Sequence, residues 1–549
     1  MPAFLSFMRG FGWKLCIALI VVAVGDYLFF QRNLSGGYLG IFAFVLLLAL
    51  LNGRPAIWRD RRALAAALAA AIFASALVFD PGLLSWSLFC IAISMATLLP
   101  VTGRFDDGWR WFQRLVLHGL RSIVAPLIDM GKLLRARRSR HAVRPGLRQL
   151  APVLALPLLG SAVIIGLFAA ANPVIGNLLS AIGMPDLSML SIGRMILWTL
   201  LFILVWSILR PRLARGLLPT FDGSGDLPLP GVSVASVRLS LILFNLLFAI
   251  QNMLDVGYLW GIAPLPDGMT LAQYAHRGAY PLIATALLAG LFVLVTLRPG
   301  STTAAVPAIR RLLVLWIAQN ILLVASSILR TLDYIDAFSL TRLRVAALAW
   351  MVLVAIGLLL ICWRMLRGRS AGWLINSNLA AAGAMLTAAC FVDSGSVAAY
   401  WNVRHAREVG GTGAALDLCY LDGLDGAALL PLIELEGRRL PPAFRVRVQV
   451  VRARMMDRLT HWNANGEWTW RNADRLDRAK RLLAHRKSVP IEKGDRTCNG
   501  ALVPPPPAPP APPPPQAAAA QVRTTIPPQR WPNDPRADRG DALTAGQQR

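Results

Sequence analysis

The chain has 549 residues, of which 56% are hydrophobic and 15% charged, and its formal net charge is +27. Soluble domains carry roughly 25% charged residues, so this composition excludes an ordinary soluble protein and indicates long uncharged membrane segments. Cytoplasmic loops of membrane proteins accumulate Lys and Arg, and no nucleic-acid-binding motif accompanies the charge, so we expect no nucleic-acid partner.

About eleven apolar segments are long enough to cross a bilayer core, which needs roughly 20 residues per helix. They predict an all-α fold, a polytopic helical membrane bundle over residues 1–392. The predicted spans are 15–30, 35–51, 63–79, 83–100, 151–171, 190–209, 234–251, 281–297, 312–328, 345–363 and 373–392. The first is the weakest, because it is short and Ala23-Val24-Gly25 loosely resembles a signal-peptidase site. We favour an uncleaved helix, since apolar residues continue through Phe30.

The connections between these spans differ in their arginine content. Those that follow even-numbered spans hold most of the Arg and Lys residues, including a large cluster within residues 101–150, and the others hold few. Because cytoplasmic connections are enriched in Lys and Arg, the N-terminus is predicted inside and the C-terminal region outside.

Residues 101–150 form a basic cytoplasmic loop with apolar residues at roughly helical spacing. These residues are Trp109, Phe112, Leu115, Val116 and Leu120, with Arg110, Arg114 and Arg121 interleaved. Such a segment could lie on the inner leaflet with its cations near anionic lipid headgroups. It could equally be a solvated connector with positive-inside bias.

The last part of the chain divides into two regions. Residues 393–490 mix apolar and charged positions as a small helical extracytoplasmic domain would, with helices expected over 397–405, 416–421 and 427–435. Residues 444–450 alternate like a strand, but the helical pattern extends to residue 459, so a helix is predicted. Residues 491–549 are Pro-rich and then polar, which predicts a disordered tail.

No sequence motif identifies a reaction. Nucleotide-binding, metalloprotease, hydrolase and kinase motifs are missing from the sequence. The six histidines show no metal-ligand spacing, and the six cysteines form no CxxC pair. We therefore predict no catalytic, cofactor-binding or metal-binding residues.

Several polar residues fall inside or at the ends of predicted spans, and Asp26 is the only acidic one well inside a span. Asp26 lies in the first span, where a charge is costly and by default suggests a function, although near the span's outer end it could reach interfacial water. Asn245 and Asn320 are expected to form interhelical hydrogen bonds, and a polar substrate path is the alternative.

The external connection 330–344 is the densest polar cluster. Its candidate residues are Arg330, Asp333, Tyr334, Thr341, Arg342 and Arg344. Asp333 could pair with Arg330 on a helical turn, and Ser339 is placed to N-cap the next helix. Either these ions satisfy one another at the bilayer edge, or the arginines bind an anionic headgroup or a phosphate-bearing ligand.

One positive charge of this connection is unmatched, because three arginines face only Asp333 and Asp336. An anionic headgroup, a phosphate-bearing ligand or an acid of the C-terminal domain could balance it. We favour an acid of the domain, which offers Asp417, Asp422 and Asp425.

Two groups of residues carry a family resemblance. The first is Ser326-Ser327-Ile328-Leu329-Arg330 with Tyr334 and Leu340-Thr341-Arg342-Leu343-Arg344; the second is Tyr400-Trp401-Asn402-Val403 with Leu416-Asp417-Leu418-Cys419-Tyr420-Leu421, Leu424-Asp425 and Pro431. Over roughly residues 150–480 the chain resembles a bacterial family of multi-pass membrane proteins catalogued only as a domain of unknown function. The basic loop and the tail lie outside the resemblance. It implies an inner-membrane location and an extracytoplasmic helical C-terminal domain, and it implies no reaction.

Three classes of function remain. An envelope scaffold or regulatory protein would use the outer domain and tail to contact an envelope protein. A transporter or lipid-handling protein would use the helix bundle, and a membrane enzyme would act on a lipid-linked substrate. Convergence of Asp26, Asn245, Asn320 and Arg330 on one cavity would favour the last two.

Overall fold

The computed structural model describes residues 2–103, 105–138, 191–213, 216–219, 233–259, 300–486 and 494–503, with single residues between 160 and 174 and between 285 and 292. Within them the regular elements are helices, apart from one isolated bridge between Arg496 and Leu502. The chain divides into two compact units, Met1–Leu502 and Val503–Arg549, and nearly all described residues belong to the first.

The first group of helices shares one hydrophobic core. It comprises α1 (Pro2–Asp26) with the π-helical turn Tyr27–Gln31, α2 (Tyr38–Gly53), α3 (Arg61–Phe79), α4 (Leu83–Thr102), α5 (Gly108–Arg138) and α8 (Ile192–Leu209). Alanines at positions 63, 67, 70 and 74 form the buried face of α3. Small residues let membrane helices approach closely, and large buried side chains such as Phe42, Phe89 and Trp206 fill the remaining space.

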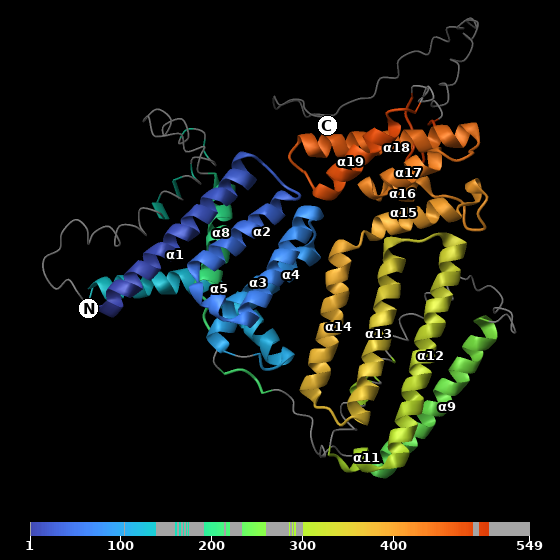
Figure 1. The fold of residues 1–549 in the computed structure, drawn as a ribbon, viewed down its shortest axis with the longest axis horizontal. Coiled ribbons are helices and arrows are strands. Elements are labelled where there is room, and N and C mark those ends of the chain that lie inside the picture. Colours follow the sequence, from blue (N-terminus) through green and yellow to red (C-terminus); the bar gives the residue numbers. More distant parts are fainter. Residues whose placement is uncertain are drawn as a thin grey trace, which may run out of the picture. The chain divides into compact units, whose positions relative to one another are not determined.

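A second group of helices has its core around Trp316. It comprises α9 (Val234–Leu259), the short α11 (Thr302–Ala305), α12 (Pro307–Phe338), α13 (Arg342–Leu366) and α14 (Ala371–Phe391). This core lies between α9, α12 and α13, and α14 packs on α13. Figure 1 shows α12, α13 and α14 side by side, with α9 along α12. Leu241, Leu313 and Leu358 surround Trp316 in the core of this group.

The protein is a multi-pass integral membrane protein. Among the described residues, eight helices are long and apolar enough to cross a bilayer, and α2 is a shorter apolar helix. Leu243, Leu247 and Met253 of α9 are 50–74% exposed; contiguous exposed apolar surface of this kind is rare in soluble proteins and suits contact with lipid. These eight helices and α2 match nine of the predicted spans; spans 151–171 and 281–297 fall largely outside the described residues.

The five helices that follow α14 have a hydrophobic core of their own, and we call them the C-terminal cluster. They are α15 (Ser394–His405), α16 (Leu418–Asp422), α17 (Leu429–Glu436), α18 (Pro442–Ala464) and α19 (Trp470–Leu483), drawn in orange in Figure 1. Leu421, Leu432, Val451 and Met455 are fully buried in this core. The helix expected over residues 444–459 is confirmed, because α18 is continuous through them.

A disulfide closes the C-terminal cluster. Cys419 of α16 bonds Cys498, 79 residues further along the chain, with the two Cα atoms 4.9 Å apart. Cross-linking a loop of this length removes chain entropy worth about 4 kcal/mol from the unfolded state. This disulfide was not predicted, because the spacing of cysteines in a sequence does not reveal a long-range bond. Residue 498 lies in the stretch predicted as tail, of which residues 504–549 lie outside the described part.

Candidate functional site

The C-terminal cluster binds one end of the membrane helices, which we call the near end; the opposite end is the far end. The connection between α1 and α2 pairs with the turn before α19, where Gly37 N donates to Trp468 O at 2.6 Å and Ser35 N to Gly466 O at 2.9 Å. These backbone bonds hold the first helix group against the cluster.

Arg471 joins both helix groups to the cluster. Its guanidinium forms an ion pair with Asp80, the residue that ends α3, and donates to the Phe391 carbonyl at the end of α14 at 3.0 Å. The same guanidinium lies 4.6 Å from the ring centroid of Phe79. Arg471 is buried, so the loss of its charge would leave these three groups without a shared partner.

Asn402 fixes the connection between α12 and α13. Its side-chain amide donates to Leu340 O at 2.9 Å and accepts from Leu340 N at 2.7 Å. The amide therefore bonds both backbone polar atoms of Leu340, as another backbone segment would. Beside it, Arg342 N donates to the Tyr420 hydroxyl at 2.9 Å, and its guanidinium donates to Leu424 O at 3.3 Å. The two residue groups that carried the family resemblance therefore meet at the near end.

The connection itself has an unusual backbone. Ser339 ends α12 with φ +70°, a conformation that costs roughly 1–3 kcal/mol for a residue other than glycine. Arg344 satisfies the carbonyls there, donating to Phe338 O at 2.8 Å and to Ser339 O, while it lies 4.1 Å from the ring centroid of Tyr334. Thr341 N-caps α13 by accepting from Arg344 N at 3.3 Å, so the cap expected from Ser339 was wrong.

A cavity of about 310 Å³ opens where the end of α12 meets the cluster. It is lined by Ile335, Asp336 and Ser339 of the α12 end, Trp401, Asn402 and His405 of α15, and Thr412, Gly413 and Ala414. The Trp401 and His405 rings stack with centroids 4.1 Å apart. A carboxylate, an imidazole and an indole around one opening could bind a small polar ligand or a side chain of a partner.

The acids expected to balance Arg342 have other partners. Asp417 N-caps α16 by accepting from Tyr420 N at 2.9 Å. Asp422 pairs with Arg454 and Arg458, and Asp425 lies 4.0 Å from Arg458. The cluster therefore contacts Arg342 through a hydroxyl and a carbonyl, where we had favoured a carboxylate.

Asp26 is buried against α8, although the sequence suggested that it could reach interfacial water. Arg194 of α8 donates to both of its carboxylate oxygens, at 2.7 and 2.5 Å. Trp198 Nε1 and Gln31 Nε2 each donate at 2.8 Å. Asp26 and Arg194 are 5% and 7% exposed, so this carboxylate has four donated hydrogen bonds and a bidentate counter-ion.

A second aspartate–arginine pair joins α9 to α12. Asp255 forms an ion pair with Arg330 and accepts from Ser326 Oγ at 3.2 Å and Gln251 Nε2 at 2.9 Å. The sequence suggested Asp333 as the partner of Arg330. Asp26 was also expected to be the only acid well inside an apolar segment, but Asp255 lies in a candidate span and is 2% exposed.

Polar side chains continue along the α9–α12 interface beyond the Asp255–Arg330 pair. We call residues 245, 252, 255, 319, 326 and 330 the polar seam. Asn245 Nδ2 donates to Leu312 O at 3.0 Å, Gln319 Nε2 to Asn245 Oδ1 at 2.9 Å, and Asn252 Nδ2 to Gln319 O at 3.2 Å. Asn252 Oδ1 and Gln319 Oε1 are buried and have no hydrogen-bond partner among the residues that the structure describes. Asn320 bonds its own helix, donating to Trp316 O at 2.8 Å.

Four predicted residues were expected to reveal a cavity if they converged. Asp26 belongs to the α1–α8 contact, whereas Asn245, Asn320 and Arg330 lie on α9 and α12. Within the described part of the chain, no three His, Cys, Asp or Glu residues are grouped so that they could hold a metal ion. The predicted polar residues therefore lie in separate regions: around Asp26, along the polar seam and at the near end.

A family model described as a domain of unknown function (DUF4153) matches residues 63–435. The chain belongs to this family. No curated protein and no solved structure matches the chain. The resemblance seen in the sequence is thereby confirmed, but its limits were wrong, because the DUF4153 match takes in the basic loop and ends before residue 480.

The limits of the DUF4153 match separate the near-end contacts into two sets. The contacts of Asn402 with Leu340 and of Arg342 with Tyr420 lie inside residues 63–435. Arg471 and the Trp468 backbone lie beyond the match, and so does Cys498. The family segment therefore contains the cavity and the polar seam, and the docking by α19 is added after it.

Proposed function

We propose that the protein is an envelope scaffold or regulatory protein of the bacterial inner membrane, with its C-terminal cluster outside the cytoplasm. The observation that most directly supports this proposal is that the cluster contacts the ends of both helix groups at once through Arg471. A unit anchored in this way can present a partner-binding surface in a fixed orientation and can transmit a change at that surface to the membrane helices.

Two observations support the orientation. Arginine is concentrated in far-end connections, as expected for a cytoplasmic side, and long domains cross the membrane largely regardless of their own charge. The Cys419–Cys498 disulfide at the near end suits an oxidising compartment. A reporter active only in the periplasm should be active when fused after residue 400 and inactive when fused near residue 130; the reverse pattern would refute the orientation.

The scaffold proposal is tested by site-specific photo-cross-linking in cells. A photoreactive residue at Trp470 or at Leu482, which are 57% and 51% exposed on α19, should give the same discrete protein adduct. Arg471→Gln should abolish that adduct at an unchanged level of protein, because the cluster would lose its fixed position. The same label at Leu68, which is 65% exposed on α3, is the control and should give no protein adduct. Adducts that differ between the two α19 sites, or that persist in Arg471→Gln, would refute the proposal.

Transport is a second candidate, favoured by the polar seam. Asn252 is buried inside the membrane helices, and its acceptor atom has no partner in the described part of the chain. Such a group costs roughly 1–3 kcal/mol unless water or a ligand reaches it. Ser326→Cys tests access. A membrane-impermeant thiol reagent should label this cysteine if the seam is open to water, and an unreactive cysteine would show a closed structural contact.

Contact of α5 with anionic lipid is a further part of the proposal. Of the residues at helical spacing, Phe112 and Leu120 are about 60% exposed, which favours a leaflet surface over a solvated connector. The opposite side of α5 is fixed to α8, where Asp129 accepts from Arg212 at 2.6 Å and from Trp206 Nε1 at 3.1 Å. Phosphatidylglycerol vesicles should protect exposed α5 positions from aqueous labels, and phosphatidylcholine vesicles should protect them less.

A further inference from the structure

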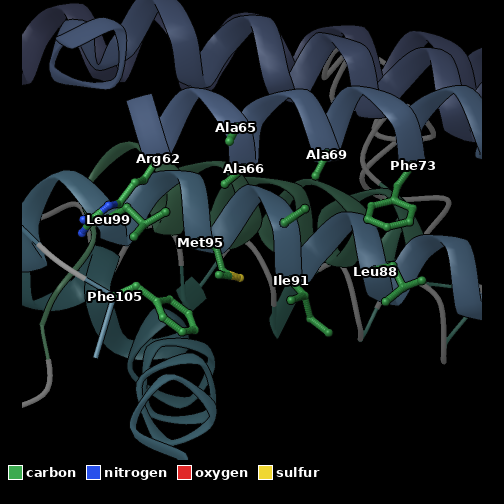
Figure 2. A pocket seen from close by; sticks show the side chains of 11 residues that line it. Arg62, Ala65, Ala66, Ala69, Phe73, Leu88, Ile91, Met95, Leu99 and Phe105 are labelled. Carbon is green, nitrogen blue, oxygen red and sulfur yellow. The ribbon is translucent and has the colours of Figure 1, made fainter. Parts of the chain in front are cut away.

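An apolar groove of about 420 Å³ runs between α3 and α4. Figure 2 shows Ala65, Ala66 and Ala69 along one wall and Leu88, Ile91 and Met95 along the other. The alanines make the groove, because larger side chains on that face of α3 would fill it. Its lining is almost wholly apolar, so a polar ligand would find no partners inside.

Among the described residues that line the groove, one is charged, and it lies at the far end of the membrane helices. Arg62 stands there beside Leu99 and Phe105, and Phe73 closes the other end near Leu88 (Figure 2). Arg62 lies in the second position of α3. Its guanidinium is thus placed where an α-helix leaves the hydrocarbon region, at the level of lipid phosphates.

The length of the groove matches one leaflet. From Arg62 to Phe73 the helix rises about 16 Å at 1.5 Å per residue, and a bilayer core of about 30 Å gives each leaflet about half of that. An occupant that enters at Arg62 and ends at Phe73 therefore extends from the lipid phosphates to the bilayer centre.

We propose that this groove binds one acyl chain of an anionic phospholipid, with its phosphate on Arg62. The charge, the apolar lining and the one-leaflet length all suit such a lipid. A transmembrane helix of a second copy would extend through both leaflets, so it would pass beyond Phe73. On the proposed orientation, the leaflet is the cytoplasmic one.

The test uses the full-length protein in phosphatidylcholine vesicles that contain a minor fraction of acyl-spin-labelled phosphatidylglycerol. Ala65 is exposed and lines the groove, so Ala65→Phe should fill it without disturbing the core and remove the protein-immobilised fraction of label. Arg62→Gln should weaken retention about fivefold, the contribution of one cation near the membrane surface.

Matched controls are available on the same helix. Leu68→Phe changes an exposed apolar position outside the groove, and Arg61→Gln removes a neighbouring charge; both should retain the lipid as the unmodified protein does. Equal immobilisation in all variants would show unspecific boundary lipid and overturn the proposal. A change of oligomeric state in Ala65→Phe, with lipid retention unchanged, would assign the groove to a second copy and overturn it as well.

Discussion

The two aspartate–arginine pairs inside the membrane helices differ in what surrounds them. Asp26 receives four hydrogen bonds, two of them from Arg194, and its surroundings are closed by aromatic rings. Asp255 is more deeply buried, yet its pair with Arg330 continues into a seam whose polar atoms are only partly bonded. An intramembrane charge suggests a function by default. Each carboxylate has three partner residues, so the buried polar atoms beside the Asp255–Arg330 pair, and not the count of partners, separate a functional candidate from a structural pair.

The largest effect on stability is expected at the Asp26–Arg194 pair. Asp26→Asn leaves the Arg194 guanidinium buried without a counter-ion, which costs roughly 3–5 kcal/mol. We expect a strong fall in the thermal unfolding midpoint in detergent. The double variant Asp26→Asn with Arg194→Gln should recover most of that loss, because no uncompensated charge remains. A single variant as stable as the unmodified protein would show that the pair contributes little.

At the Asp255–Arg330 pair we expect a smaller loss of stability. Asp255→Asn removes the counter-ion of Arg330, but the asparagine oxygen and the Ser326 hydroxyl can still accept hydrogen bonds there, and other polar side chains lie along the same interface. The expected cost is about 1–3 kcal/mol, measured in the same unfolding experiment. A loss as large as that of Asp26→Asn would remove the distinction between the two pairs.

The seam itself provides a sharper contrast. Asn252→Leu removes a buried acceptor that lacks a partner among the described residues, together with one hydrogen bond to Gln319 O. These effects oppose each other, so the unfolding free energy should change by less than about 1 kcal/mol. Reaction of Ser326→Cys with an aqueous thiol reagent should nevertheless fall, because the leucine blocks the seam. Unchanged labelling would show that water reaches Ser326 by another route.

The sequence predicted element positions well and long-range partners poorly. Hydropathy located nine spans, because the length and apolar content of a span are local properties. The same method ended the seventh span at residue 251, so it excluded Asp255, although α9 continues to Leu259. Asp26 and Arg194 are 168 residues apart, and neither periodicity nor spacing reports such a pair.

The near-end contacts were likewise predicted only in part. Asn402, Arg342 and Tyr420 were named from the family resemblance, and the structure brings them together. Arg471 gave no signal, because it is one arginine of many in a basic helix. Its partners, Asp80 and Phe391, lie at the ends of α3 and α14, far away in the sequence. The cap of α13 was placed two residues early, since the strained backbone of Ser339 could not be foreseen.

An ion pair outside the membrane helices completes the comparison and predicts the smallest effect. Asp393 N-caps α15 by accepting from Ser396 N at 3.1 Å and pairs with Arg475 of α19. Burial alone would raise the pKa of Asp393, but the charges of Arg475 and Arg471 and the hydrogen bonds from Ser396 together outweigh it and hold that pKa below its ordinary value. Glu434 behaves alike: burial opposes Arg404 and Arg438, and the net pKa is lowered.

Because the folded-state pKa of Asp393 is depressed, its contribution to stability is fully present above the unfolded-state pKa, about 3.9. That contribution is lost as the pH falls below this value through the folded-state pKa. Limited proteolysis of the C-terminal cluster should therefore accelerate modestly as the pH falls below about 4, as expected for a partly exposed pair, whose worth is roughly 1 kcal/mol or less. Asp393→Asn should reduce this acid sensitivity without abolishing it, because Glu434 titrates in the same direction. Acid sensitivity that is unchanged in Asp393→Asn would assign the effect to other carboxylates, and the pairs inside the membrane helices would then be the next to test.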